Sequence, residues 1–406
     1  MQDNEKKPAL RFKGFTDPWE QRKLEEYLEV SSQKNFEGIY TKEDVLSVSG
    51  DFGIVNQIEF QGRSFAGASV ANYGVVETGD IVYTKSPLKS NPYGIIKANK
   101  GKNGIVSTLY AVYKPKQSVN PEFVQIYFEQ DARMNNYMHP LVNKGAKNDM
   151  KVSAENALKG QIVFPDIKEQ RTISEFFRNL ETLITLHQRK YEKLVNIKKS
   201  MLNKMFPPNG ASVPEIRFKG FTDPWEQRKL KELYFQLTER NTDLLPYQKT
   251  LSVATMSFKT DGNGAADTSL ANYKRLRTGD IAFEGHTSKE FRYGRFVLND
   301  VGDGIMSPRF SALRPLHEMP INFWKYYIHY EPIMRKVLVN STKAGTMMNE
   351  LVINDFLQGS ILVPSMAEQQ AIGRFFKQLD TLITLHQRKL EKLQNIKKSC
   401  LEKMFV

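Results

Sequence analysis

The sequence predicts an α+β protein in which two mixed α/β domains are joined by two long, antiparallel, coiled-coil-like helices, as a pseudo-twofold tandem repeat. Two observations support this prediction: the chain duplicates itself, and each copy ends in a long segment whose apolar residues have heptad spacing. The expected organisation is a first domain over residues 1–165, a first helix over 166–206, a linker over 207–216, a second domain over 217–364 and a second helix over 365–406.

The duplication is strongest at the two ends of each copy. The fourteen residues RFKGFTDPWEQRKL begin at Arg11 and recur unchanged from Arg217. Near the other end, TLITLHQRK begins at Thr182 and recurs unchanged from Thr381. Between these ends the copies have diverged, although short phrases such as TGDI are kept. This distribution indicates two units that share a scaffold and differ in their exposed surfaces.

The middle of each copy, residues 24–164 and 230–363, is expected to contain strands and a few helices. Short apolar runs such as GDIVY and GIVSTLYAVY alternate with Gly, Asn and Pro, which is typical of strands separated by turns. In PEFVQIYFEQ and INFWKYYIHY, apolar and aromatic residues recur every three to four positions after a proline, which predicts a helix. Each middle region is therefore expected to fold as a mixed α/β domain.

Residues 168–206 and 367–405 contain no Gly or Pro except Gly373, and their apolar residues follow a heptad pattern. This spacing predicts one long packing helix in each copy, and we expect the two helices to pack antiparallel and hold the domains apart. The alternative is that each helix only completes the core of its own domain. The positions expected to pack are Ile173, Phe177, Leu180, Ile184, His187, Leu194, Ile372, Phe376, Leu379, Ile383, His386 and Leu393.

Composition excludes several classes of protein. Cys400 is the single cysteine, so neither an internal disulfide nor a cysteine-based zinc site can form. The charged start MQDNEKKPAL lacks the apolar run of a signal peptide. No segment has the roughly 20 apolar residues that a membrane span requires. We therefore expect a cytoplasmic protein.

The sequence contains no motif that predicts catalysis. The basic loop GIIKANKGKN from Gly94 lacks the glycine spacing of a phosphate-binding loop, and Asn103 stands where Ser or Thr would hold magnesium. PDIK from Pro165 resembles the start of some nuclease sites, but the second copy lacks the carboxylate. No histidines have a metal-ligand spacing such as HExxH. The sequence therefore predicts binding, with no metal or cofactor held by this chain.

The charge of the chain favours a polyanionic partner, because 58 Lys and Arg exceed 45 Asp and Glu and give a net charge of +13. Four segments, residues 85–104, 143–151, 285–296 and 340–350, offer basic residues with Asn, Tyr or Thr, which suit phosphate contacts and base-edge hydrogen bonds. Because the copies differ here, we expect them to read two different DNA sequences. The candidate DNA-binding residues are Lys85, Lys89, Asn91, Tyr93, Lys97, Lys100, Lys102, Lys144, Lys147, His286, Lys289, Arg292, Tyr293, Arg295, Lys343 and Thr346.

Together, the repeated motifs resemble those of the DNA specificity subunit of a Type I restriction-modification system. The resemblance is carried by FKGFTDPWEQRKL, the GDI turn, the IVFP and ILVP strands that continue into an EQ pair, and the ITLHQRKxEKL segment, all in duplicate. In that family each variable region is a target recognition domain that reads one half of a split, asymmetric double-stranded DNA sequence. The long helices set the gap between the halves and dock two methyltransferase subunits, to which two translocating nuclease subunits attach.

The resemblance implies a non-catalytic subunit, with S-adenosylmethionine, ATP and magnesium bound by the partner subunits. It carries over no base-reading residues, because recognition domains vary freely within the family. Two alternatives remain open: the recognition portion of a self-sufficient restriction enzyme, and a coiled-coil scaffold that binds no DNA. The first would require methylase or nuclease motifs in the same chain, and the sequence has none.

Overall fold

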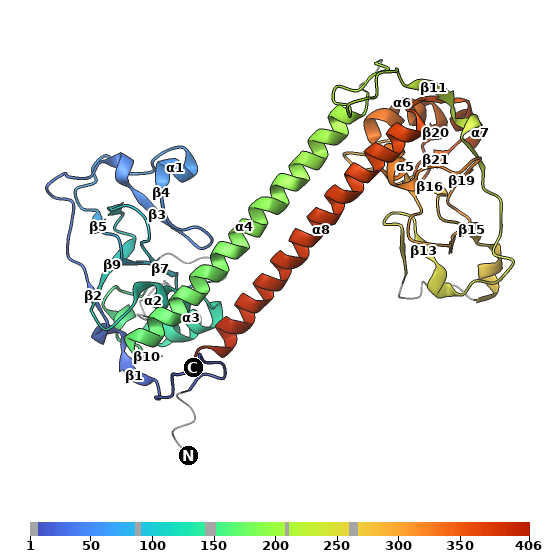
Figure 1. Cartoon of the computed structure of the whole chain (residues 1–406). Helices are drawn as coiled ribbons and strands as arrows, with labels where there is room; N and C mark the ends of the chain where they lie inside the picture. The colour runs from blue at the N-terminus through green and yellow to red at the C-terminus, as the bar shows by residue number, and fades with distance from the viewer. Residues whose placement is uncertain (1–6, 86–90, 143–151, 208–210, 260–266) are drawn as a thin grey trace. The chain divides into compact units, whose positions relative to one another are not determined.

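The computed structural model of the chain describes residues 7–85, 91–142, 152–207, 211–259 and 267–406 (Figure 1). The chain forms two compact units: unit 1 contains residues 1–187 and 389–406, and unit 2 contains residues 188–388. Each unit includes part of both long helices, α4 (Ile167–Met205) and α8 (Met366–Lys403). The two long helices agree with the sequence prediction, whereas the domain boundaries at the helix ends stay a prediction.

The described residues of unit 1 form ten strands and three shorter α-helices. They are β1 (Glu20–Lys23), β2 (Leu28–Val30), β3 (Leu46–Ser49), β4 (Gly53–Asn56), β5 (Gly74–Val76), β6 (Ile81–Thr84), β7 (Ile96–Ala98), β8 (Gly104–Val106), β9 (Tyr110–Pro115), β10 (Gln161–Phe164), α1 (Gln57–Gln61), α2 (Pro121–Tyr127) and α3 (Asp131–Met138). An antiparallel sheet in the order β2-β9-β6-β7 is central, beside the pairs β1-β10, β3-β4 and β5-β8. Strand β6 is buried at every residue, which explains its continuous apolar run.

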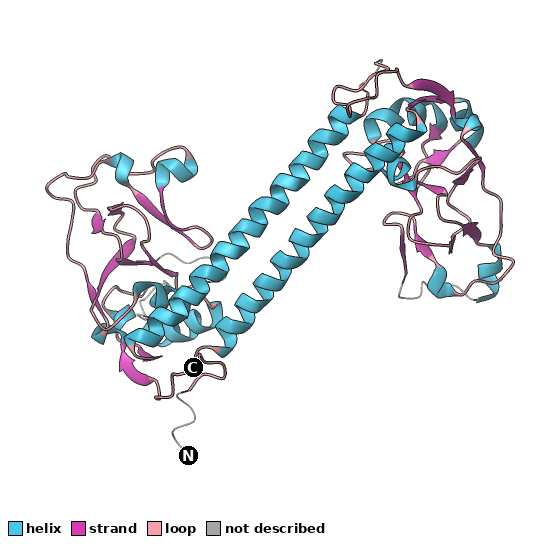
Figure 2. Cartoon of the chain, viewed as in Figure 1, coloured by secondary structure: helices cyan, strands magenta, loops and turns pink. Residues whose placement is uncertain are grey.

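Unit 2 repeats this sheet order as β12-β19-β16-β17, beside the pairs β11-β22, β13-β14, β15-β18 and β20-β21. Its elements are β11 (Glu226–Lys229), β12 (Tyr234–Gln236), β13 (Leu251–Ser252), β14 (Ser257–Phe258), β15 (Lys274–Leu276), β16 (Ile281–Glu284), β17 (Arg295–Leu298), β18 (Gly304–Met306), β19 (Ala312–Pro315), β20 (Thr342–Lys343), β21 (Glu350–Leu351), β22 (Ser360–Val363), α5 (Ile321–Tyr327), α6 (Glu331–Ser341) and α7 (Ile353–Gln358). Strands and helices occur in both units, so the predicted mixed α/β class is confirmed (Figure 2).

The repeated end sequences form the same buried ion pair in both units. Arg11 donates from Nε and Nη2 to the two carboxylate oxygens of Glu169, each at 2.7 Å. Arg217 donates to Glu368 in the same bidentate way, also at 2.7 Å. Both glutamates are buried, so the arginine compensates a carboxylate that water cannot reach. The pair ties the first repeated segment to the start of each long helix.

Gly373 is the one residue that interrupts the helix-forming composition of the long helices. The equivalent residue of α4 is Ser174, whose hydroxyl lies 3.1 Å from Oδ1 of Asn120. Asn120 caps α2 by accepting from the N–H of Phe123 at 3.0 Å. In unit 2, a Cβ on Gly373 would lie 2.7 Å from the backbone nitrogen of Phe323 in α5. Glycine therefore allows α8 and α5 to pack more closely than a side chain would permit.

Each unit's core contains the end of the long helix that belongs to the other copy. In unit 1, Phe405 follows α8, is 5% exposed, and packs with Trp19 in the main apolar cluster. In unit 2, Phe206 follows α4, is 1% exposed, and packs with Trp225. The alternative that each helix completes only the core of its own domain is therefore wrong, because each helix contributes to both cores.

The heptad positions lie on the less exposed face of both helices. Six of them are buried, namely Ile173, Phe177, Leu180, Ile372, Phe376 and Leu379. The other six are half-buried, namely Ile184, His187, Leu194, Ile383, His386 and Leu393. Ion pairs join the helices within each unit. Lys397 pairs with Glu181 in unit 1, and the Lys198 ammonium lies 2.6 Å from Asp380 in unit 2.

Cys400, the one cysteine, is buried in the core of unit 1. Burial raises the pKa of its thiol, which keeps it in the unreactive neutral form. In the part of the chain that the structure describes, no three His, Cys, Asp or Glu side chains are grouped so that they could hold a metal ion. No helix in these ranges has both the length and the apolar character that crossing a membrane requires.

Candidate nucleic-acid interface

The central sheet of each unit has two ends that differ in their side chains. In unit 2, Glu284 at the end of β16 faces Arg295 at the start of β17, so the loop that connects these two strands lies at one end of the sheet. In unit 1, Thr84 faces Tyr110, so the loop after β6 and the turn before β9 lie together in the same way. We call this the variable end. The TGDI phrase lies at the opposite end of the same strands, which we call the TGDI end.

Two candidate loops of unit 2 meet at the variable end. One connects β16 to β17 and the other connects β20 to β21. The Asn349 N–H donates to the carbonyl of Gly285 at 2.9 Å, and the Asn349 side-chain amide donates to the carbonyl of Arg292 at 3.1 Å. A Cβ on Gly285 would lie only 2.1 Å from the Asn349 carbonyl oxygen, so glycine is required here. The two loops predicted from the sequence therefore form one surface.

Two arginines of this surface stack over aromatic rings. The Arg292 guanidinium lies 5.9 Å from the ring centroid of Tyr293, and that of Arg295 lies 5.0 Å from Phe291. Arg295 also donates to the carbonyl of Ala254 at 3.0 Å, which brings the β13-β14 hairpin to the same end. Among the described residues neither arginine pairs with a carboxylate, so both remain able to bind a phosphate or a base edge.

The structure adds an arginine that the sequence analysis missed. Arg309 is exposed in the turn between β18 and β19, with its guanidinium 5.6 Å from the ring centroid of Phe310. It lines a surface depression of about 440 Å³ together with Thr346 and Met347 of the β20-β21 loop. The alignment of GIVSTLYAVYKP with GIMSPRFSALRP places Arg309 opposite Leu109. This difference between the two copies is the sequence feature from which Arg309 could have been predicted as a candidate.

The other candidates of unit 2 lie on the surface. His286 is exposed and its Nδ1 contacts Glu284. Lys289, Lys343 and Thr346 are also exposed, and Tyr293 is half-buried. Three candidates of unit 1, Lys89, Lys144 and Lys147, lie outside the described residues.

The lysine-rich segment 85–104 does not form one surface. In the β6-β7 hairpin Ile81 faces Ala98, so residues that precede β7 and residues that follow it lie at opposite ends. Lys85, Asn91 and Tyr93 therefore belong to the variable end. Lys100 and Lys102 are exposed at the TGDI end, where the Lys100 ammonium lies 3.5 Å from Glu122. The candidates of this segment therefore lie at two different ends of the sheet, because a hairpin reverses the chain.

Two candidates of unit 1 are buried, and their assignment to the DNA surface is corrected. Asn91 is 8% exposed, and its side-chain amide donates to Asp131 at 2.9 Å. Lys97 is also 8% exposed, because every residue of β7 faces the interior, and burial lowers the pKa of its ammonium group. Lys85 is half-buried, and its ammonium donates to the carbonyl of Thr108 at 3.0 Å.

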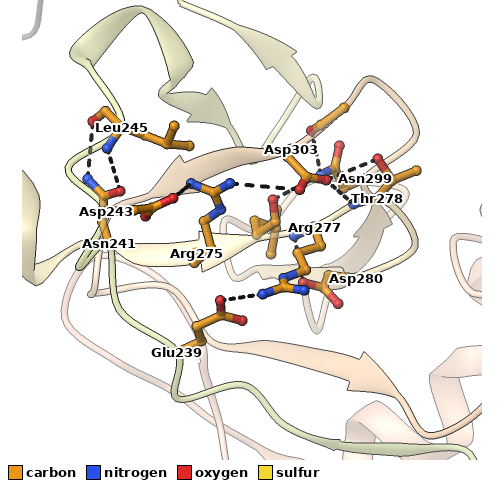
Figure 3. A network of polar contacts seen from close by, with 12 residues as sticks. Glu239, Asn241, Asp243, Leu245, Arg275, Arg277, Thr278, Asp280, Asn299 and Asp303 are labelled. Carbon is orange, nitrogen blue, oxygen red and sulfur yellow. Dashed lines mark hydrogen bonds and ion pairs between the residues drawn. The ribbon is translucent and has the colours of Figure 1, made fainter.

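The TGDI end is held by ion pairs in both units. The Asp280 carboxylate accepts from the N–H of Arg277 at 2.7 Å (Figure 3). It also accepts from the Arg314 guanidinium at 2.8 Å. Burial raises the pKa of Asp280 although Arg314 opposes that shift. In unit 1, Asp80 likewise accepts from a backbone N–H at 2.7 Å and from Lys114 at 2.8 Å. The aspartate of the repeated motif therefore stabilises the scaffold.

Further pairs in Figure 3 show why this end is a poor anion-binding surface. The Arg275 guanidinium lies 2.8 Å from Asp243 and 3.8 Å from Asp303, and Arg277 lies 2.8 Å from Glu239. Carboxylates thus neutralise the arginines of the TGDI end. At the variable end, Arg292, Arg295 and Arg309 have no carboxylate partner among the described residues and lie over aromatic rings.

The chain is similar to known proteins over almost its whole length. Residues 223–395 match the family model of the Type I restriction modification DNA specificity domain. The putative type I restriction enzyme MjaX specificity subunit of Methanocaldococcus jannaschii is 20% identical over 414 residues, which cover 94% of this chain and 91% of that protein. Both matches support a Type I restriction-modification DNA specificity subunit, and the family domain itself lies in residues 223–395.

A solved structure of a specificity subunit shares its fold. The crystal structure of the Type I restriction-modification S subunit from M. genitalium is 11% identical, covers 98% of this chain and 99% of its own, and gives a TM-score of 0.53. The HsdS subunit from Thermoanaerobacter tengcongensis is 16% identical, covers 95% and 96%, and gives a TM-score of 0.45. The repeated motifs hold the scaffold of both units, and arginines without a carboxylate partner among the described residues lie at the variable end of unit 2.

Proposed function

We propose that this specificity subunit reads a bipartite, asymmetric DNA sequence, with the variable end of each unit reading one half. One observation carries the proposal: the two units share their sheet order, while the side chains at their variable ends differ. Unit 2 presents Arg292, Arg295 and Arg309, whereas unit 1 presents Lys85 and Leu109. Different side chains on one scaffold are suited to reading different bases, because each base pair offers its own pattern of donors, acceptors and methyl groups.

A region exchange tests this proposal. Residues 24–164 are replaced by the variable region of a relative, and the methylated sequence is determined with the methyltransferase subunits present. We expect one half of the methylated sequence to change and the other half to stay the same. A change in both halves would contradict two independent readers.

We also propose that α4 and α8 form an antiparallel, coiled-coil-like pair about a pseudo-twofold axis and set the gap between the two half-sequences. The ion pairs between the helices support this arrangement: Glu181 pairs with Lys397, and Lys198 pairs with Asp380. The partner of the later α4 residue is the earlier α8 residue, as expected for two helices that run in opposite directions. The two numbers of each pair have the same sum, which is the register expected for straight antiparallel helices.

The long helices also carry an apolar surface that no core uses. Leu183 and Leu186 of α4 are 45% and 44% exposed, and the equivalent Leu382 and Leu385 of α8 are both 44% exposed. They lie in the segment TLITLHQRK, which is identical in both copies. We propose that each leucine pair docks one methyltransferase subunit, because two identical patches suit two copies of one partner. Two nuclease subunits would then attach through the complex.

This assignment makes the chain a non-catalytic, cytoplasmic subunit that holds no cofactor. S-adenosylmethionine, ATP and magnesium would be bound by the methyltransferase and nuclease subunits. The scaffold alternative is tested by measuring DNA binding of the methyltransferase with and without this chain. Sequence-specific binding that appears only when the chain is added supports the proposal, and unchanged binding favours a scaffold that does not contact DNA.

A further inference from the structure

One turn between two strands is built in the same way in both units. It joins β8 to β9 in unit 1 and β18 to β19 in unit 2. The Tyr110 N–H donates to the carbonyl of Ser107 at 3.0 Å, and the Phe310 N–H donates to that of Ser307 at 3.2 Å. The backbone of the turn is therefore the same, although the residues at its tip differ.

The strand that leads into this turn is rigidly held. A Cβ on Gly104 would lie 2.4 Å from the carbonyl oxygen of Asp44, and a Cβ on Gly304 would lie 2.6 Å from that of Lys249. All three residues of β8 and of β18 are buried. Close packing of this kind fixes the backbone of the strand, so the tip residue is presented from a defined position.

The tips carry side chains of different chemistry. Leu109 is 61% exposed, so its apolar side chain is accessible at the surface. Arg309 is exposed, lies over the Phe310 ring, and has no carboxylate partner among the described residues. Neither tip side chain is a member of an apolar cluster among the described residues, so core packing does not account for its identity.

Both tips adjoin the loops of the variable end. In unit 1, Lys85 donates from its backbone N–H to the carbonyl of Leu109 at 3.2 Å and from its ammonium to that of Thr108. In unit 2, Arg309 lines the same depression as Thr346 and Met347. The tip residue is thus positioned to reach whatever the neighbouring loops bind.

We propose that Leu109 and Arg309 are equivalent specificity-determining residues, each reading one base pair of its half-sequence. Arg309 presents a fork of N–H donors that matches O6 and N7 of guanine in the major groove. Leu109 has no polar group and matches the methyl group of thymine. The inference rests on the proposed function, since it requires the variable ends to face DNA.

The test uses the full chain in complex with its methyltransferase subunits. The methylated sequence is mapped for Arg309→Ala, Arg309→Lys, Leu109→Ala and a control, Arg228→Ala, in which an exposed arginine of β11 is removed. We expect Arg309→Ala and Arg309→Lys to relax one position in one half-sequence, and Leu109→Ala to relax one position in the other half. Binding of the original sequence should weaken about 5- to 150-fold in these variants, and Arg228→Ala should change neither property.

Two results would overturn the inference. One is an unchanged methylated sequence in Arg309→Ala and Leu109→Ala complexes that remain active. The other is a uniform loss of affinity on all sequences with a shallower salt dependence in Arg309→Ala but not in Arg309→Lys, which would make Arg309 a phosphate contact. Failure of the proposed function can be distinguished from failure of this inference. In that case the exchange of residues 24–164 would not change one half of the methylated sequence.

Discussion

The ring of Phe405 lies edge-on to the ring of Trp19, with the centroids 6.2 Å apart and the ring planes at 82°. Trp19 belongs to the repeated segment at the start of the first copy, and Phe405 follows the long helix of the second copy. The equivalent pair in unit 2 is Phe206 and Trp225, with centroids 6.4 Å apart. Each core therefore needs residues from both copies, so we expect neither copy to fold stably alone.

The first prediction concerns this shared core. Phe405→Ala should lower the free energy of unfolding by about 3–5 kcal/mol, because it removes a buried aromatic side chain and leaves a cavity. The measurement is urea denaturation of the full chain. Val406→Ala is the control, since Val406 is 39% exposed and belongs to no apolar cluster, so its truncation should cost no more than about 0.5 kcal/mol. Equal stability of the two variants would show that the end of α8 does not stabilise unit 1.

The second prediction concerns Gly373. Gly373→Ala should destabilise the protein by about 1–3 kcal/mol, because the new Cβ would overlap the backbone of α5 and push it from α8. Ser174→Ala, at the equivalent position of α4, should cost about 1 kcal/mol because it removes only a hydroxyl hydrogen bond. Thermal unfolding of both variants measures the difference. A Gly373→Ala variant as stable as the parent would contradict the close approach.

The third prediction concerns methyltransferase docking. Changing Leu382 and Leu385 to Ser should weaken one of two docking sites at least about tenfold, because a partner that buries leucine loses that apolar contact. The stoichiometry measured by native mass spectrometry should then fall from two methyltransferase subunits to one. Changing Leu183 and Leu186 as well should abolish docking. The control is Lys377→Ser, at an exposed polar position of α8. Two methyltransferase subunits bound to the fourfold variant would refute the assignment.

The fourth prediction concerns the gap between half-sequences. Inserting four residues after Glu192 and four after Glu391 lengthens each helix by about 6 Å, which is one or two base pairs of DNA at about 3.4 Å each. The methylated half-sequences should stay the same while their separation grows by that amount. Each helix has one end in the core of unit 1 and the other end in the core of unit 2. An insertion in α4 alone should therefore strain the packing of α4 against α8 and lower the melting temperature. A stable double insertion that keeps the original separation would refute the length gauge.

The fifth prediction separates the two ends of the recognition regions. Lys289→Ala at the variable end should reduce the slope of log affinity against log salt by up to about 0.9, the value expected for one lost phosphate contact. The double variant with Lys100→Ala and Lys102→Ala, at the TGDI end, should leave that slope unchanged. Affinity of the complex for DNA is measured at several salt concentrations. The reverse result would place the TGDI end on the DNA.

The sequence alone reveals the duplication, the long helices and the mixed composition of the variable regions. These features are local, since heptad spacing and turn residues are properties of neighbouring positions. The family is likewise readable from contiguous motifs. The structural roles of these motifs cannot be read from the sequence. Asp280 and Glu368 stabilise the scaffold through ion pairs with Arg314 and Arg217, which only the structure shows.

Only the tertiary structure decided which candidate side chains face outward. Lys97 and Lys102 are similar in sequence context, yet one is buried in β7 and the other is exposed beyond it, because burial depends on strands far away in the chain. Arg309 joins the candidate surface through strand pairing that no local pattern encodes. The placement of Phe405 beside Trp19 is the longest-range example, since it depends on the path of α8 rather than on any property of either residue.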